Sequence, residues 1–259
     1  MELVDYFWIL VTTLGDEKFY VAIVPIVYLS FSMELGVELA LVFLSSMWLN
    51  GILKYTLRMP RPPKELWKVE AKGYSFPSGH TQATTTFWTF LALEKKSKVI
   101  ASIALVLVPL VAYSRVYLGV HYVQDVVGGA LIGAILVTSY SFLKKKLPVI
   151  PLHKRATIGL SSSALMWLLS IAAGNYYDPT SPSLAGILLG YFLAKKEKLK
   201  LPESKFKRGL TGLLGLIFST GLYIVSHKVS DFISFALCYI LLGFSIAYLV
   251  PKISSKLFK

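Results

Sequence analysis

The sequence predicts an all-α protein, a polytopic bundle of about nine transmembrane helices preceded by an interfacial helix at the N-terminus. Hydrophobic residues make up 55% of the 259 residues and charged residues only 16%, whereas about 25% are charged in soluble domains. Apolar runs near the length of about 20 residues that crosses a bilayer recur along the chain. A soluble globular fold and a disordered chain are therefore excluded, and the single cysteine, Cys238, excludes an intrachain disulfide framework.

The first 14 residues predict the interfacial helix. They are apolar but too short for a span, and Glu2, Asp5 and the missing basic start argue against a signal peptide. Trp8 would anchor this helix at the membrane surface. The nine predicted spans follow at residues 18–33, 35–53, 77–93, 98–114, 123–143, 156–174, 181–194, 209–226 and 231–250.

The net charge of +13 predicts membrane orientation and no nucleic-acid partner, because the basic residues lie between apolar runs. If the nine spans alternate in direction, 18 of the 27 Lys and Arg residues fall in the connections on one side. The positive-inside rule makes that side cytoplasmic. We therefore expect an integral protein of the cell membrane with its N-terminus outside and its C-terminus in the cytoplasm.

Three polar motifs lie at span ends, all on the predicted extracytoplasmic side. The motifs are Lys54-x6-Arg61-Pro62, Pro77-Ser78-Gly79-His80 and Ser114-Arg115-x5-His121-x3-Asp125. Because one face of the membrane would hold all three, the sequence predicts a single composite site there.

The first part of this site suits a phosphate group. Lys54, Arg61 and Arg115 supply three cations, and arginine binds phosphate oxygens with a planar fork. Ser78 is a typical helix N-cap residue, and Gly79 lets a ligand approach the backbone. The free amides at such a helix start attract anions.

The second part suits acid–base and nucleophilic chemistry near neutral pH. His80 and His121 can transfer protons or attack an electrophile. Asp125 follows His121 by four residues, so a helical stretch would place both on one face. The carboxylate would hold one ring nitrogen protonated and leave the other free to attack. No carboxylate cluster accompanies these residues, so the sequence predicts neither a metal site nor a cofactor.

Together the three motifs resemble those of the type 2 phosphatidic acid phosphatase superfamily, in its integral membrane branch. The resemblance covers residues from about 35 to 143 and includes every signature position. It implies that residues 1–146 form a catalytic membrane core and that residues 147–259 add further C-terminal transmembrane helices. It also implies a lipid phosphatase, a phosphoric monoester or acid-anhydride hydrolase that needs no metal.

The same resemblance implies a role for each site residue. His121 would be the nucleophile that forms a phosphohistidine, Asp125 would orient it, and His80 would be the general acid. The phosphoryl oxygens would be held by Lys54, Arg61, Ser78, Gly79 and Arg115.

The sequence leaves the substrate open among phosphorylated membrane lipids. The candidates are phosphatidate or lysophosphatidate, phosphatidylglycerol phosphate, a polyprenyl pyrophosphate and a sphingoid-base phosphate, and an outward-facing site mildly favours the polyprenyl pyrophosphate. The span count is also similar to that of the glucose-6-phosphatases, which keeps a soluble sugar phosphate open. Two other functions remain as alternatives: a phosphotransferase that passes the phosphate to a second lipid, and a non-enzymatic lipid transporter or scaffold. The oligomeric state is not predicted.

Overall fold

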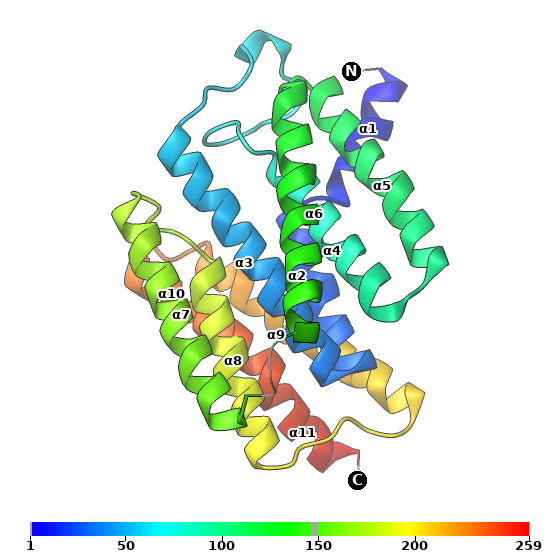
Figure 1. Ribbon diagram of the computed structural model, residues 1–259, viewed down its shortest axis with the longest axis vertical. Coiled ribbons are helices and arrows are strands. Elements are labelled where there is room, and N and C mark those ends of the chain that lie inside the picture. Colours follow the sequence, from blue (N-terminus) through cyan, green and yellow to red (C-terminus); the bar gives the residue numbers. More distant parts are fainter. Residues whose placement is uncertain (1, 147–149, 259) are drawn as a thin grey trace. The chain divides into compact units, whose positions relative to one another are not determined.

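The computed structural model describes residues 2–146 and 150–258, and helices are the only regular elements in these two stretches (Figure 1). The predicted all-α class is therefore confirmed. The chain forms two compact units, Met1–Phe19 with Ser45–Leu147 and Tyr20–Leu44 with Pro148–Lys259. The first unit contains all three motifs. The predicted division near residue 146 into a catalytic core and additional helices stays a prediction.

The first unit contains a short N-terminal helix and four longer helical segments. They are α1 (Leu3–Thr13), the C-terminal half of α3 (Met33–Leu57), α4 (Gly79–Lys95), α5 (Lys98–Tyr117) and α6 (Val123–Lys146), with a short 3-10 turn at Lys64–Leu66. The second unit contains most of α2 (Glu17–Ile26), the first half of α3, and the helices α7 (Leu152–Ala172), α8 (Thr180–Lys196), α9 (Lys205–Ser226), α10 (Phe232–Phe244) and α11 (Val250–Leu257). Short π-helical stretches follow α2 at Val27–Phe31 and α10 at Ser245–Leu249.

Six helical segments in the described part of the chain are long and apolar enough to cross a membrane. They are Met33–Leu57, Lys98–Tyr117, Val123–Lys146, Leu152–Ala172, Lys205–Ser226 and Phe232–Leu257. The predicted count of about nine spans is not confirmed. The predicted spans 77–93 and 181–194 form helices of only 17 residues, α4 and α8, and 18–33 is divided between α2 and a π-helical stretch. Many residues of α4 and α8, including polar ones, are buried inside the protein.

Helix α6 exposes one apolar face and packs its opposite face against α4. Val123, Val127, Leu131 and Ile135 follow one another at intervals of four and are exposed, which is the pattern of a lipid-facing stripe. On the opposite face, Gly129 and Gly133 lie against the first turns of α4. Small residues four apart let two helices approach closely in a membrane.

Gly129 limits the distance between α6 and the first turn of α4, next to the 77–80 motif. A Cβ atom on Gly129 would lie 2.6 Å from the carbonyl oxygen of Ser78 and 3.2 Å from the amide nitrogen of Gln82. Both neighbours are backbone atoms, which cannot move without shifting the start of α4. The glycine therefore fixes how closely α6 holds the motif at 77–80.

Gly129→Ala is expected to lower the stability of the folded protein by about 1–3 kcal/mol, the usual cost of overpacking. The measurement is thermal unfolding of the purified protein in detergent. The matched control is Gly221→Ala in α9, where a Cβ atom would meet nothing within 4 Å. Equal melting temperatures for the two variants would contradict the close packing of α6 on α4.

Buried amides connect α3 to α4 below the site. Asn50 donates to Gln82 Oε1 at 2.8 Å and to the Pro77 carbonyl at 3.1 Å, while Gln82 donates to the Ser46 carbonyl at 2.7 Å. Asn50 is 6% exposed and Gln82 is fully buried. Because a polar side chain in an apolar helix is costly unless it is paired, these bonds set the relative position of α3 and the start of α4.

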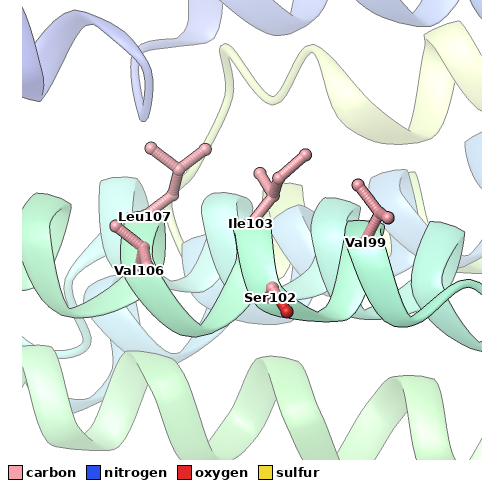
Figure 2. A pocket seen from close by; sticks show the side chains of 5 residues that line it. All are labelled: Val99, Ser102, Ile103, Val106 and Leu107. Carbon is pink, nitrogen blue, oxygen red and sulfur yellow. The ribbon is translucent and has the colours of Figure 1, made fainter.

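The apolar outer face of α5 has an open hollow away from the motifs. Figure 2 shows its lining, which consists of Val99, Ser102, Ile103, Val106 and Leu107. Val99 and Val106 are more than half exposed. This surface has the composition of a face that contacts lipid chains, and it contributes no group to the chemistry described next.

Candidate active site

The three motifs converge at one end of the first unit. Lys54 lies in the last turn of α3, Arg61 in the connection to α4, and His80 in the first turn of α4. Arg115 lies in the last turn of α5, and His121 lies in the turn before α6. Hydrogen bonds connect Arg61 to His121 and His121 to Asp125, and the charges of Lys54 and Arg115 act on both His80 and His121.

The centre of the network is a buried His121–Asp125 pair. Nδ1 of His121 lies 3.2 Å from Oδ2 of Asp125, and the two residues are 3% and 0% exposed. The two residues do not share a helix, because α6 begins at Val123 and His121 belongs to the preceding turn, so the helical condition of the prediction is not met. Asp125 still reaches back to this turn, since the same oxygen accepts the backbone amide of Tyr122 at 2.8 Å.

Arg61 determines which nitrogen of His121 carries the proton. Nη1 of Arg61 lies 3.1 Å from Nε2 of His121. A guanidinium can only donate, so Nε2 accepts and must be unprotonated. The proton of the neutral ring is then on Nδ1, where it is donated to Asp125. This tautomer leaves on Nε2 the lone pair that a nucleophile needs.

Burial lowers the pKa of His121 to about 3, because the charged imidazolium loses its water. Asp125 opposes this shift, while Arg61, Lys54 and Arg115 add to it. At neutral pH the imidazole is therefore neutral and able to attack.

The cations Lys54 and Arg61 are held by carbonyl groups of the connection before α4. Lys54 Nζ donates to Tyr74 O at 2.7 Å and to Ser75 O at 3.0 Å. Arg61 donates to Gly73 O at 3.0 Å, and its Nη1 also donates to Val120 O at 2.8 Å. These bonds fix both cations beside His121.

Arg115 is buried and has a free donor. It is 5% exposed, and Nη1 donates to Thr12 Oγ1 at 2.8 Å. Nε of Arg115 is buried without an acceptor in the described part of the chain. A buried donor of this kind is costly unless a ligand oxygen binds it. The charge of Arg115 also acts on both His80 and His121.

The motif at 77–80 starts α4 as predicted. Ser78 occupies the N-cap position, but its side chain makes no capping hydrogen bond to the helix. Ser78 Oγ accepts instead from Thr81 Oγ1 at 3.1 Å. Its amide donates to the carbonyl of Asp125 at 2.9 Å. This bond ties the start of α4 directly to Asp125, the partner of His121. Gly79 packs against Asn50.

Three contacts of the site were not predicted from the sequence. Ser75 is fully buried, donates to Oδ2 of Asp125 and lies 3.3 Å from Nδ1 of His121. Thr12 and Asp16 come from the N-terminal segment and contact Arg115 and His80. Ser75 lies only two residues before the 77–80 motif, but a lone serine carries no signal, and nothing in residues 1–19 indicates a role in the site.

Ser75→Ala is expected to lower turnover about tenfold, which corresponds to one lost hydrogen bond to a charged group. Asp125 would lose a partner that holds its Oδ2 toward His121. The measurement is phosphate release at saturating lipid phosphate. Ser163→Ala in α7 removes another buried serine hydroxyl, which bonds only the Gly159 carbonyl, and it should leave turnover unchanged. Identical turnover of the two variants would refute a role for Ser75 in the site.

The chain is similar to phosphatases that act on lipid phosphates. It is 26% identical over 201 residues to sphingosine-1-phosphate phosphatase 2 of Homo sapiens, covering 70% of this chain and 50% of that protein. It is 37% identical over 110 residues to phosphatidylglycerophosphatase B of Bacillus subtilis, covering 39% of this chain and 54% of that protein. The chain thus spans about half the length of these curated relatives.

A solved structure and a family model agree with these relatives. A transmembrane phosphatidylglycerolphosphate phosphatase of Bacillus subtilis, of the PAP2 type, matches 58% of this chain and 81% of its own with a TM-score of 0.50 and 29% identity. The model of the PAP2 superfamily matches residues 35–147, which contain all three motifs. Residues 35–147, with the complete motif set gathered at one end of the first unit, are therefore similar to the PAP2 superfamily and to phosphatases of that type.

Proposed function

We propose that this protein is a membrane phosphatase that hydrolyses a phosphorylated lipid through a phosphohistidine at His121. The observation that carries the proposal is the state of the His121 ring. Asp125 receives the proton of Nδ1, and Arg61 donates to Nε2, so the lone pair of Nε2 lies among fixed cations. A phosphate drawn to these cations would meet a neutral nucleophile already in the required tautomer.

The proposed reaction has two steps. In the first, Nε2 of His121 attacks phosphorus, the bond from phosphorus to the leaving oxygen breaks, and His80 gives that oxygen its proton. In the second, water attacks the phosphohistidine, His80 takes a proton from the water, and phosphate leaves as His121 is regenerated. Arg61, Arg115 and Lys54 neutralise the charge that develops on the phosphoryl oxygens, so the proposed reaction uses no metal ion.

Arg61 has an additional role in this scheme. Its Nη1 occupies the lone pair of Nε2 in the structure, so this hydrogen bond must be released before His121 can attack. A phosphate oxygen is a stronger acceptor than a neutral imidazole, because charge-assisted hydrogen bonds are stronger. Substrate binding would therefore redirect Arg61 to the phosphate and uncover the nucleophile.

The class of substrate follows from the place of the site. The motifs lie at the ends of apolar helices, where a lipid can keep its chains in the bilayer and present its phosphate to the cations. The relatives include a sphingosine-1-phosphate phosphatase and a phosphatidylglycerophosphatase, so sphingoid-base phosphates and phosphatidylglycerol phosphate join phosphatidate and polyprenyl pyrophosphate as substrates to test. The basic connections support a site that faces outward, away from the cytoplasm.

The test is a panel assay of the purified protein in detergent with these four lipids, measuring free phosphate with and without a chelator. We expect release from at least one lipid in the presence of chelator. Rapid denaturation during turnover should trap phosphate on the protein in an acid-labile, base-stable form, as expected for phosphohistidine. If no free phosphate is released and a phosphorylated alcohol forms when an alcohol acceptor is added, the protein is a phosphotransferase. Failure to release or transfer phosphate from all four lipids would refute the proposed enzyme.

A further inference from the structure

The N-terminal segment is bound to the site at several points. Asp5 of α1 accepts from Lys68 Nζ at 2.7 Å and from Tyr117 OH at 2.9 Å. Thr12, at the other end of α1, accepts from Arg115. The turn that follows then passes directly over His80. This segment therefore belongs to the site's framework and is more than a surface anchor.

Gly15 shows how closely this turn approaches His80. A Cβ atom on Gly15 would lie 2.9 Å from the Cβ atom of His80 and 3.0 Å from its carbonyl oxygen. Only a residue without a side chain fits here unless α4 moves. The next residue, Asp16, places Oδ2 3.7 Å from Nε2 of His80.

The charged groups around His80 have opposite effects on its proton. Burial has the largest effect and disfavours the protonated form of the ring, and the cations Arg115 of α5 and Lys54 of α3 add to it. Asp16 is the anion that acts on it in the described part of the chain. The contact with His80 lowers the pKa of Asp16 to about 2, so this carboxylate is ionised throughout the neutral range. A general acid surrounded by phosphate-binding cations needs such an anion to stay protonated.

We propose that Asp16 is a positioning residue that favours the protonated form of the His80 imidazole against burial and directs it toward the leaving oxygen. The inference rests on the proposed function, in which His80 is the proton donor. No proton moves to Asp16 in the reaction: His80 gives its proton to the leaving oxygen and regains one from water. The protein would then contain two His–Asp pairs with opposite purposes. Asp125 keeps Nε2 of His121 unprotonated, and Asp16 favours the charged form of His80.

The experiment compares the pH profiles of turnover for wild type, Asp16→Asn and Asp16→Glu, using the panel lipid that is hydrolysed fastest. The amide of Asp16→Asn keeps the shape but loses the charge, so His80 should lose its proton at lower pH. We expect the basic limb of the profile to move down by about one pH unit, the effect of a single opposite charge, with about a tenfold loss above neutral pH. Asp16→Glu should keep the limb within a few tenths of a unit.

Two controls separate this effect from damage to the fold. Glu94→Gln removes a carboxylate at the far end of α4, where it pairs with Lys144 at 2.9 Å, and should leave the profile unchanged. In a His80→Ala background, Asp16→Asn should cost nothing further, because the two residues act as a unit. If Asp16→Asn does not fold, Asp16→Ser takes its place, and the same downward displacement of the basic limb is expected.

The outcomes distinguish this inference from the proposed function. A wild type without phosphate release overturns the proposed function itself. An active wild type with a basic limb that Asp16→Asn leaves in place, or an equal loss at every pH, overturns the role of Asp16 alone. A basic limb displaced by Asp16→Glu as far as by Asp16→Asn also overturns it, as does an added loss in the His80→Ala background.

Discussion

Replacing His121 with alanine is expected to reduce phosphate release at least about 10³-fold, because the variant lacks the atom that bonds to phosphorus. The trapped phosphoprotein should disappear as well. His121 is the one histidine in the described part of the chain with an Arg61 donor on Nε2 and an Asp125 acceptor on Nδ1. The measurement is initial-rate phosphate release, together with quantification of acid-labile phosphate on the denatured protein.

The matched control is His227→Ala in the second unit. His227 follows α9, and its Nδ1 contacts the Tyr223 carbonyl at 2.9 Å. This variant should retain wild-type turnover and the trapped phosphoprotein. Substantial turnover by His121→Ala would remove the nucleophile assignment, although the match of residues 35–147 to the PAP2 superfamily would stand.

Arg115→Lys should show the second largest effect, a loss of about 10²-fold in turnover, which is typical for removing one preorganised donor from a transition state. Lysine keeps the positive charge but cannot replace the Nε donor, which is buried without an acceptor among the described residues. Nor can it reproduce the planar fork that binds two phosphate oxygens. Because this donor is proposed to bind the developing charge, kcat should fall more than KM rises.

The control for this variant is Arg155→Lys at the start of α7. Arg155 is exposed and donates Nε to the Ile150 carbonyl at 2.7 Å. This change should be neutral for turnover. If Arg115→Lys also leaves kcat unchanged, Arg115 serves to hold Thr12 and the N-terminal segment, and its role in binding phosphate is refuted.

The sequence alone was sufficient for the helical class and for the resemblance of its motifs to the PAP2 superfamily, and it predicted site residues whose roles the variants above would test. The helical class follows from composition and from the length of the apolar runs. A helix must be about 20 apolar residues long to cross the hydrocarbon core of a bilayer, so such runs can be recognised in the sequence. The motif residues could be recognised because their chemistry needs particular side chains at particular spacings. His121 and Asp125, four residues apart, contact each other as predicted.

The number of spans was harder to predict, because hydropathy describes one segment at a time. Helices α4 and α8 resemble spans in sequence, but each has 17 residues and buries polar groups against protein. Gln82 illustrates the difference, since its cost in an apolar helix is removed by bonds to Asn50 and Ser46 that no local pattern reveals. Burial by neighbours is a property of packing and not of the segment.

The sequence by itself determined which groups are the candidates for the proposed chemistry: two histidines, one aspartate and three cations. Only the tertiary structure decided how those groups are set for their tasks. It placed Arg61 on Nε2 of His121, which fixes the tautomer, and it brought Asp16 to His80 from 64 positions away. The physical reason is that tautomer and charge state depend on partners within a few ångströms, and these partners are selected by folding over long separations in the chain.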